Sequence, residues 1–262
     1  MGITKIGVCG VGVVGGAIKR YYKEKGFDVR GYDRDPDRSD CTFEDLKKCD
    51  VVFVSVPTLT NSNGSQALMP FLTVMQNFDA IKFKGIIVHK CTVIPGTTKY
   101  FASQYPKLRI VHCPEFLTEA NAFNDFKNAI AVMLSGHPGD VAIVSDILEG
   151  KIIHTFDDYE STEIAKYVHN CFLATKVSFM NEMFDVCKHF NVEYEPMIKA
   201  VSWMGGIGQG HLKVPGPDGL RGWGGMCFVK DTQAFINAMA INNIWLEVLA
   251  GAIKTNKKVR GE

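Results

Sequence analysis

The most specific chemical feature of the chain is a cysteine at the end of a glycine-rich segment. Residues 222–231 read GWGGMCFVKD, so Cys227 follows three glycines and precedes Asp231. Glycines let a backbone approach a substrate closely. A helix expected to begin near Asp231 would favour the thiolate of Cys227 through the field at its N-terminus. The pattern indicates a nucleophile at Cys227 and a helix cap or proton carrier at Asp231. A small buried apolar residue is the alternative role for a single cysteine.

Three further segments place polar side chains where they could assist such a nucleophile. Thr92 follows a predicted strand and could present its hydroxyl at the edge of a sheet, although a simple helix cap is the better explanation of Thr92 taken alone. Glu115 and Glu119 could divide acid–base and binding roles, or could lie in a solvated turn. Lys166 and Asn170 share one face of a predicted helix and could stabilise an oxyanion, although such pairs usually lie at the surface.

A glycine motif near the N-terminus predicts a dinucleotide site. Gly10-Val11-Gly12-Val13-Val14-Gly15 directly follows a predicted strand and opens a predicted helix. Gly10 permits the tight turn, Gly12 lets the backbone approach a pyrophosphate, and Gly15 lets helix and strand pack closely. Asp33 ends the next strand, where a carboxylate can bind a ribose 2′-hydroxyl, which favours NAD over NADP. Arg34 leaves room for NADP, and a glycine turn without a ligand is the remaining alternative.

These residues must be positioned by alternating strands and helices in the first part of the chain. Short runs rich in Val and Ile, without clean alternation, are typical of strands buried on both faces of a parallel sheet. The predicted strands are Lys5–Cys9, Asp28–Tyr32, Val51–Ser55, Ile86–His89, Arg109–Val111, Ile130–Leu134 and Ile152–His154. Amphipathic segments lie near 14–25, 64–78, 96–104 and 139–149. The alternation predicts a Rossmann-type, doubly wound α/β domain over residues 1–155.

The second part of the chain, residues 156–262, has a helical pattern. No Pro, Gly or strand signal interrupts the chain from Tyr159 to about Phe190, which predicts one long central helix. A shorter helix near 195–203, a glycine-rich loop over 204–227 and a last helix over 231–254 follow. We therefore expect a smaller all-helical domain that carries the candidate Lys, Asn and Cys, with a long loop of the kind that is often functional.

Composition excludes several classes of protein. A net charge of +1 gives no electrostatic reason to bind nucleic acid or an anionic membrane. The basic residues Lys254, Lys257, Lys258 and Arg260 are expected to form a solvated helix end. The eight cysteines show no metal-ligand spacing, so we expect no metal. No signal peptide or membrane span is apparent, which indicates a cytoplasmic protein with reduced thiols.

Taken together, six ordered motifs resemble the UDP-glucose/GDP-mannose dehydrogenase family. They are GVGVVG, SVPT at 55–58, CTVIPGT at 91–97, PEFLTEA, EIAKYVHNCFLATKVSFMNE at 163–182 and GWGGMCFVKD. The resemblance implies that Cys227 is the nucleophile, Glu115 the general base, Thr92 and Asp231 the holders of the hydrolytic water, and Lys166 and Asn170 the stabilisers of the oxyanion. It implies NAD contacts from the whole motif Gly10–Gly15 and from Asp33, Arg38, Pro57, Thr58, Thr92 and Glu119. It implies substrate contacts from Glu115, Phe116, Leu117, Lys166, Asn170, Lys213 and Gly224.

The resemblance also implies a reaction. The family oxidises the C6 alcohol of a nucleotide sugar in a four-electron, NAD-dependent reaction, through a thiohemiacetal and a thioester on the cysteine. UDP-glucose, giving UDP-glucuronate, is the expected substrate. A homodimer is expected through the long helix, which carries apolar residues at Ile164, Val168, Phe172, Phe179 and Met183. Family members continue into a third domain that grips the nucleotide, and this chain is expected to lack most of it.

Two other interpretations remain open. β-Hydroxyacid dehydrogenases also join a GxGxxG domain to a helical domain with Lys and Asn one turn apart, but they perform a single oxidation and need no cysteine. A non-catalytic subunit that retains the fold and binds a nucleotide or another chain is the second alternative, because the third domain is expected to be missing.

Overall fold

A computed structural model describes residues 3–61 and 63–262 of the chain. The chain divides into two compact units. The first comprises the residues up to Leu59 together with Gln66–Lys166, and the second comprises Thr60–Ser65 and Tyr167–Glu262. The division therefore falls inside the long helix, whereas the sequence placed it at residue 155. It also assigns the short segment 60–65 to the helical unit, which the sequence did not indicate.

The first unit is built on a seven-stranded sheet in the order β2-β1-β3-β6-β7-β8-β9. The strands are β1 (Lys5–Cys9), β2 (Asp28–Tyr32), β3 (Val51–Val54), β6 (Ile86–His89), β7 (Arg109–His112), β8 (Ala131–Gly136) and β9 (Ile152–Phe156). All seven predicted strands are present, and differences are confined to their ends. The expected parallel arrangement holds from β2 to β7, but β8 pairs antiparallel to β7 and β9 runs parallel to β8. Periodicity along one strand carries no information about direction, and antiparallel edges are common in doubly wound sheets.

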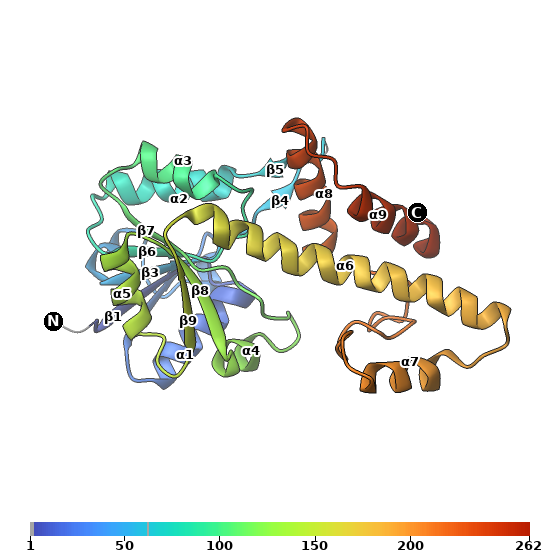
Figure 1. Cartoon of the computed structure of the whole chain (residues 1–262). Coiled ribbons are helices and arrows are strands. Elements are labelled where there is room, and N and C mark those ends of the chain that lie inside the picture. The colour runs from blue at the N-terminus through green and yellow to red at the C-terminus, as the bar shows by residue number, and fades with distance from the viewer. Residues whose placement is uncertain (1–2, 62) are drawn as a thin grey trace. The chain divides into compact units, whose positions relative to one another are not determined.

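Helices cover both faces of this sheet (Figure 1). One face packs against α1 (Val13–Glu24), α4 (Ala122–Asn128) and α5 (Pro138–Asp146), and the other packs against α2 (Met69–Ala80) and α3 (Thr97–Gln104). Successive side chains of a strand enter opposite cores, which explains the apolar runs without polar alternation. The doubly wound architecture predicted from the sequence is confirmed.

Short elements between these helices were not predicted. Helix α4 was missed, and the helix predicted over 64–78 begins only at Met69. The residues ahead of α2 form a small hairpin of β4 (Leu59–Thr60) and β5 (Gln66–Ala67). Two 3-10 helices, η1 (Pro36–Arg38) and η2 (Glu44–Lys48), join β2 to β3. Elements of this length show too few repeats of the apolar pattern to be found from the sequence.

The second unit is helical, as predicted, but its last helix is interrupted. Helix α6 (Tyr159–His189) is continuous, and α7 (Tyr194–Trp203), α8 (Met226–Ile241) and α9 (Glu247–Arg260) follow it. The single helix predicted over 231–254 is therefore two helices. The first of them, α8, begins before residue 231, because Gly225, with a φ of 78°, is its N-cap. It ends at Ile241, and Asn243 then takes a left-handed φ of 59°. Cys227 consequently lies in the first turn of α8 and not ahead of the helix.

A pair of buried histidines lies between the sheet and the start of α6 in the first unit. The rings of His89 on β6 and His112 on β7 are stacked, with their centroids 4.4 Å apart. Nε2 of His89 lies 2.9 Å from the Thr98 hydroxyl, and Nδ1 of His112 lies 2.7 Å from the Thr162 hydroxyl. Burial lowers the pKa of His112 to about 3 and the pKa of His89 well below its ordinary value. Both rings are therefore neutral in the folded protein at physiological pH.

This neutral pair predicts a loss of stability in mild acid. An unfolded histidine binds a proton near pH 6.5, whereas folded His112 does not, so the stabilisation is complete above that pH and is lost as the pH falls towards 3. His112→Phe removes one such group while Thr162 keeps hydrogen bonds to Ser135 and Tyr159. Between pH 7 and pH 5 the wild type should lose about 2 kcal/mol more unfolding free energy than the variant. Urea denaturation at both pH values measures this, and equal losses would contradict the prediction.

Candidate active site

The turn between β1 and α1 accepts only glycine at two positions of the GVGVVG motif. Gly10 has a φ of 90°, and a Cβ placed on it would lie 2.7 Å from the Ser55 carbonyl oxygen. A Cβ on Gly15 would lie 1.9 Å from the carbonyl oxygen of Gly10, because helix and turn are in contact there. At Gly12 a Cβ would meet no atom of the protein within 4 Å, so this side of the turn is open to a ligand.

The start of α1 is suited to a pyrophosphate. Gly12 caps the helix without a side-chain hydrogen bond, and exposed Val13 is its first residue, followed by Val14. Asp33, which follows β2, accepts the Val11 N–H through Oδ2 at 2.7 Å and the Asp35 N–H through Oδ1 at 3.0 Å. The first N–H groups of a helix lack partners within the helix and bind anions. The glycines, the open helix end and the acid beside it fit NAD.

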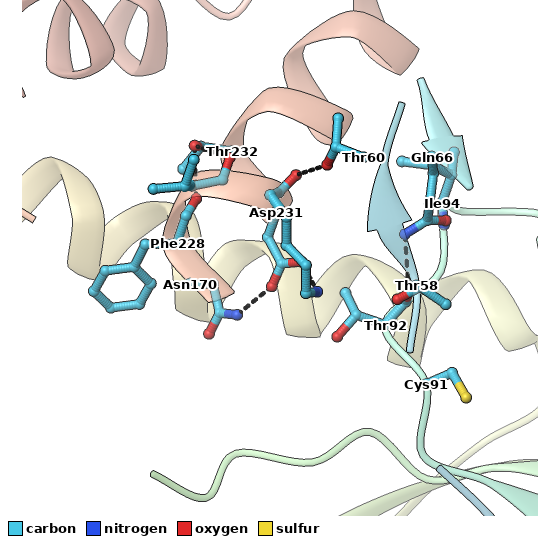
Figure 2. A network of polar contacts seen from close by, with 12 residues as sticks. Thr58, Thr60, Gln66, Cys91, Thr92, Ile94, Asn170, Phe228, Asp231 and Thr232 are labelled. Carbon is cyan, nitrogen blue, oxygen red and sulfur yellow. Dashed lines mark hydrogen bonds and ion pairs between the residues drawn. The ribbon is translucent and has the colours of Figure 1, made fainter. Parts of the chain in front are cut away.

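Two segments that follow β3 and β6 are joined by hydrogen bonds at the carboxyl edge of the sheet. The Thr58 hydroxyl donates to the Thr92 carbonyl at 2.8 Å, and the Gln66 amide donates to the same oxygen at 2.9 Å. Gln66 also accepts the N–H of Ile94 at 3.0 Å. Figure 2 shows these side chains around the backbone of the CTVIPGT segment. The arrangement leaves Thr92 partly exposed.

The other NAD-contact candidates from the sequence lie near these segments along the chain. Pro57 is exposed immediately before buried Thr58. Arg38, at the end of η1, is largely exposed, and its Nε lies 3.2 Å from Oδ2 of Asp35. Glu119 is exposed in the loop after β7. Each is therefore accessible to a ligand in the first unit taken by itself.

Glu115 is held by a buried lysine that the sequence did not single out. Nζ of Lys90 lies 3.0 Å from Oε2 of Glu115 and 3.2 Å from the sulfur of Cys113. Oε1 of Glu115 accepts the N–H of Phe116 at 2.9 Å. Burial acts to lower the pKa of Lys90, but Cys113 and Glu115 outweigh it and raise that pKa above its ordinary value. Lys90 is therefore a permanent cation beside the predicted general base.

A cavity of about 400 Å³ in the first unit adjoins this ion pair. It is lined by Lys90, Glu115, Phe116, Leu117 and Lys151 among others. Lys166, on the first part of α6, lies with its Nζ 4.9 Å from the centre of the Phe116 ring. The residues that the sequence proposed for substrate contact in this unit thus gather around one loop, 114–117.

The remaining catalytic candidates come together within the second unit. Asn170 of α6 donates to Oδ2 of Asp231 at 2.6 Å, and Oδ1 of Asp231 pairs with Lys230 (Figure 2). Asp231 lies on the first part of α8, one turn after exposed Cys227. The hydroxyl of Thr60, from the hairpin, donates to the Lys230 carbonyl at 3.1 Å. The bond between Asn170 and Asp231 therefore joins α6 to α8, the helix that carries Cys227, a contact that the spacing of these residues in the sequence did not predict.

The glycine-rich loop differs from its interpretation in the sequence. A Cβ on Gly224 would lie 2.8 Å from the guanidinium of Arg260, and one on Gly222 would lie 2.3 Å from Oδ1 of Asn256. These two glycines admit side chains of α9, whereas Gly225 has open space around it. Lys213 is exposed earlier in the loop. The side chain of Arg260 is only 13% exposed, so the expectation of a wholly solvated basic helix end is wrong for this residue.

Some functional side chains could not be recognised from the sequence. Glu163, completely buried near the start of α6, accepts the N–H groups of Gly96 and Thr98 and the Thr98 hydroxyl. Lys90 could have been singled out, because it directly follows a predicted apolar strand, and a buried charged residue needs a partner. Glu163 and Asn256 carried no such signal, because a polar residue inside a helical pattern is usually on the solvent side.

The fold and the glycine turn define the class: a Rossmann-type dinucleotide-binding unit followed by a helical unit. Residues 38–148 match the NAD-binding domain of the UDP-glucose/GDP-mannose dehydrogenase family, and residues 160–258 match the central domain of that family. The chain belongs to the UDP-glucose/GDP-mannose dehydrogenase family, and the dinucleotide of its first unit is NAD. The resemblance recognised in the sequence motifs is confirmed.

Individual relatives agree with this assignment. The chain is 32% identical to UDP-glucose 6-dehydrogenase of Rickettsia conorii over 82% of this chain and 50% of that protein. The chain thus spans about half the length of the curated relatives it matches. A UDP-glucose dehydrogenase from Pyrobaculum islandicum has the same fold, with a TM-score of 0.84, 23% identity and coverage of 98% of this chain and 68% of that one.

The fold is also shared with a smaller dehydrogenase. A 3-hydroxyisobutyrate dehydrogenase from Mycobacterium tuberculosis has a TM-score of 0.77 at 17% identity and is matched over 94% of its length, with 99% of this chain covered. Among the described residues, no helix is long and apolar enough to cross a membrane. No group of three or more His, Cys, Asp or Glu side chains in residues 3–61 and 63–262 is arranged to hold a metal ion.

The buried pair of Lys90 and Glu115 predicts a specific stability effect. Lys90→Met should lower the unfolding free energy by about 3 kcal/mol, because the Glu115 carboxylate keeps its burial but loses its counter-charge. Adding Glu115→Gln to that variant should restore part of the loss. Lys99→Met, which removes an exposed pair with Glu160, should change stability by less than about 1 kcal/mol. Chemical denaturation at pH 7 measures all three, and an unrelieved double variant would argue against the ion pair.

Proposed function

We propose that the chain catalyses the NAD-dependent, four-electron oxidation of the C6 alcohol of a nucleotide sugar, with UDP-glucose as the favoured substrate and UDP-glucuronate as the product. The observation that carries the proposal is the hydrogen bond between Asn170 and Asp231. It ties the helix that bears the predicted oxyanion-stabilising residues to the second turn of the helix that bears exposed Cys227. Membership of the family supports the same chemistry.

The cofactor would be held by the turn after β1 and by Asp33. The N–H groups at the start of α1 suit the pyrophosphate, and the Asp33 carboxylate suits the ribose 2′-hydroxyl and repels a 2′-phosphate. We place Arg38, Pro57, Thr58, Thr92 and Glu119 around the same molecule. When bound, NAD accepts a hydride from the reacting carbon in each of the two oxidations.

The residues of the chain would then handle the carbonyl. The thiolate of Cys227 adds to the aldehyde carbon, a C–S bond forms, and the carbonyl electron pair moves to oxygen. Lys166 and Asn170, one turn apart on α6, stabilise that negative oxygen through an ammonium and an amide. Loss of the second hydride leaves a thioester on Cys227.

Hydrolysis of the thioester requires a positioned water and a base. Thr92 and Asp231 would orient the water, and Glu115 would remove its proton as the C–O bond forms and the Cys227 thiolate leaves. The Glu115 carboxylate is kept in place by Lys90 at 3.0 Å and by the Phe116 N–H at 2.9 Å. We place Phe116, Leu117, Lys213 and Gly224 in contact with the substrate.

A single-step oxidation of a β-hydroxyacid is the second candidate, since a 3-hydroxyisobutyrate dehydrogenase has the same fold. That reaction needs no cysteine, and the exposure of Cys227 at the start of α8 favours the four-electron reaction. A non-catalytic subunit that retains the fold is the third interpretation, which the sequence left open. The number of NADH molecules formed per substrate is two for the proposed reaction, one for the second candidate and zero for the third.

We further propose that α6 mediates a homodimer. Four of the apolar residues predicted for this role, Ile164, Val168, Phe172 and Phe179, are exposed on α6, whereas Met183 packs inside the second unit. Val168 and Phe172 lie one turn apart and are 61% and 65% exposed. An apolar face of this kind, continued along a helix, is typical of an interface between subunits.

The dimer is tested by Phe172→Glu. Light scattering of the wild type should give twice the 29.0 kDa mass of the chain at micromolar concentration. The dissociation constant of the dimer should rise at least about tenfold in the variant, because a carboxylate buried in the interface without a partner is costly. Val248→Glu, at an equally exposed apolar position on α9, is the control and should leave the mass unchanged. A monomeric wild type would refute the proposal.

The nucleophile is tested by Cys227→Ser. Turnover of a panel of nucleotide sugars, followed by NADH absorbance and mass analysis, should give two NADH per acid with the wild type. The variant should form acid at least about 100-fold more slowly, because a serine oxygen is a poorer nucleophile and leaving group than a thiolate at neutral pH. Its NAD affinity should be unchanged, and Cys171→Ser on α6 should retain activity. Acid formation at the wild-type rate in Cys227→Ser would reduce Cys227 to a packing residue.

A further inference from the structure

We infer that α9 is a positioning element for the nucleophile: Asn256 and Arg260 fix the loop 221–225 and thereby the start of α8. The inference rests on the proposed role of Cys227, and all of its contacts lie within the second unit. The sequence predicts a solvated basic helix end at Lys254, Lys257, Lys258 and Arg260. In the structure Lys254, Lys257 and Lys258 are exposed, whereas the side chain of Arg260 is largely buried and faces the loop, as does Asn256 one turn before it.

Asn256 holds both backbone groups of one loop residue. Its Oδ1 accepts the Trp223 N–H at 2.6 Å, and its Nδ2 donates to the Trp223 carbonyl at 2.9 Å. The residue is 4% exposed, so both bonds are shielded from water. Gly222, with a φ of 73°, is required beside it, because a Cβ there would lie 2.3 Å from the Asn256 oxygen. A two-point amide clamp of this kind fixes the rotation of the peptide chain as well as its position.

Arg260 holds the loop one residue further on. Its guanidinium lies against the backbone of Gly224, where a Cβ would be 2.8 Å from Nη2. Nη1 donates to the Asp218 carboxylate at 3.1 Å and to the Arg221 carbonyl at 3.3 Å. The glycines of GWGG therefore serve at two positions to admit α9, which assigns them a role besides substrate access.

The loop is held from its other side by α6. The Trp223 indole donates to the Ser178 hydroxyl at 2.9 Å, and Oδ1 of Asn181 accepts the Gly222 N–H at 3.1 Å. The Ser178 hydroxyl in turn donates to the carbonyl of Ala252 on α9 at 2.8 Å. The segment 222–224 is consequently fixed between two helices, both of which it contacts through buried hydrogen bonds.

This fixation bears directly on Cys227. Gly225, the next residue, has open space around it, and its φ of 78° begins α8. A glycine-rich loop is otherwise the most flexible kind of backbone, and a site on it would lose its geometry. Anchoring residues 222–224 places the first turn of α8, and hence Cys227, in one orientation.

The test compares Asn256→Ala with Thr255→Val, a neighbouring change on α9. Thr255 donates to Glu182 on α6 and does not bond to the loop, so it controls for weakened packing of the helix. In Asn256→Ala, amide hydrogen exchange in residues 222–229 should accelerate by at least about tenfold, with less than about twofold change in α7. In Thr255→Val, exchange in 222–229 should change by less than about twofold.

The catalytic consequence is read in the same variants. In Asn256→Ala, kcat for acid formation should fall by at least about tenfold while the dissociation constant for NAD stays within about twofold of the wild type. Arg260→Lys should retain more activity than Arg260→Ala, because lysine keeps a donor towards Asp218. It should retain less activity than the wild type, because lysine has no flat group to cover Gly224. The Arg260 variants also decide the matter if Asn256→Ala does not fold.

Two results would overturn the inference. One is unchanged hydrogen exchange over 222–229 in both Asn256→Ala and Arg260→Ala. The other is a loss of activity in Thr255→Val as large as that in Asn256→Ala, since the effect would then be one of general stability. A wild type that oxidises no nucleotide sugar would defeat the proposed function alone. The exchange data would still show whether α9 holds the loop.

Discussion

The arrangement of the chain depends on a carboxylate buried near the start of its longest helix. Glu163 accepts the N–H of Gly96 at 2.6 Å, the N–H of Thr98 at 2.8 Å and the Thr98 hydroxyl at 2.5 Å. The first N–H groups of α3 thereby receive a cap from α6. Burial raises the pKa of Glu163, although the donors from Thr98 and Gly96 oppose that rise. A buried acid is tolerated here because it satisfies a helix end that has no other cap.

This anchor fixes the start of α6, the helix that carries Lys166 and Asn170. Lys166 follows Glu163 by nearly one turn and reaches the Phe116 ring, while Asn170 lies one turn further and donates to Asp231. Both residues are on one continuous helix, so the helical repeat sets their spacing along it.

Two carboxylates of the proposed chemistry, Glu115 and Asp231, are each paired with a lysine. Lys90 pairs with Glu115, and Lys230 pairs with Asp231. Lys90 and Glu115 are far apart in the sequence and meet because they follow two neighbouring parallel strands. Lys230 and Asp231 are adjacent residues of one helix. In both pairs the lysine holds one carboxylate oxygen in place, and the carboxylate still has lone pairs for a water or an N–H group.

The sequence by itself determined the features that are written in a local pattern. The bounds of β1, β2 and β6, the turn at Gly10 and the long uninterrupted α6 all followed from apolar runs, from glycine spacing or from the absence of Pro and Gly. Six ordered motifs also determined the family. Tertiary structure alone decided the direction of β8 and the inclusion of residues 60–65 in the second unit. It also decided the pairing of Lys90 with Glu115 and of Asn256 with Trp223, because these contacts join residues far apart in the sequence and leave no periodicity in either segment.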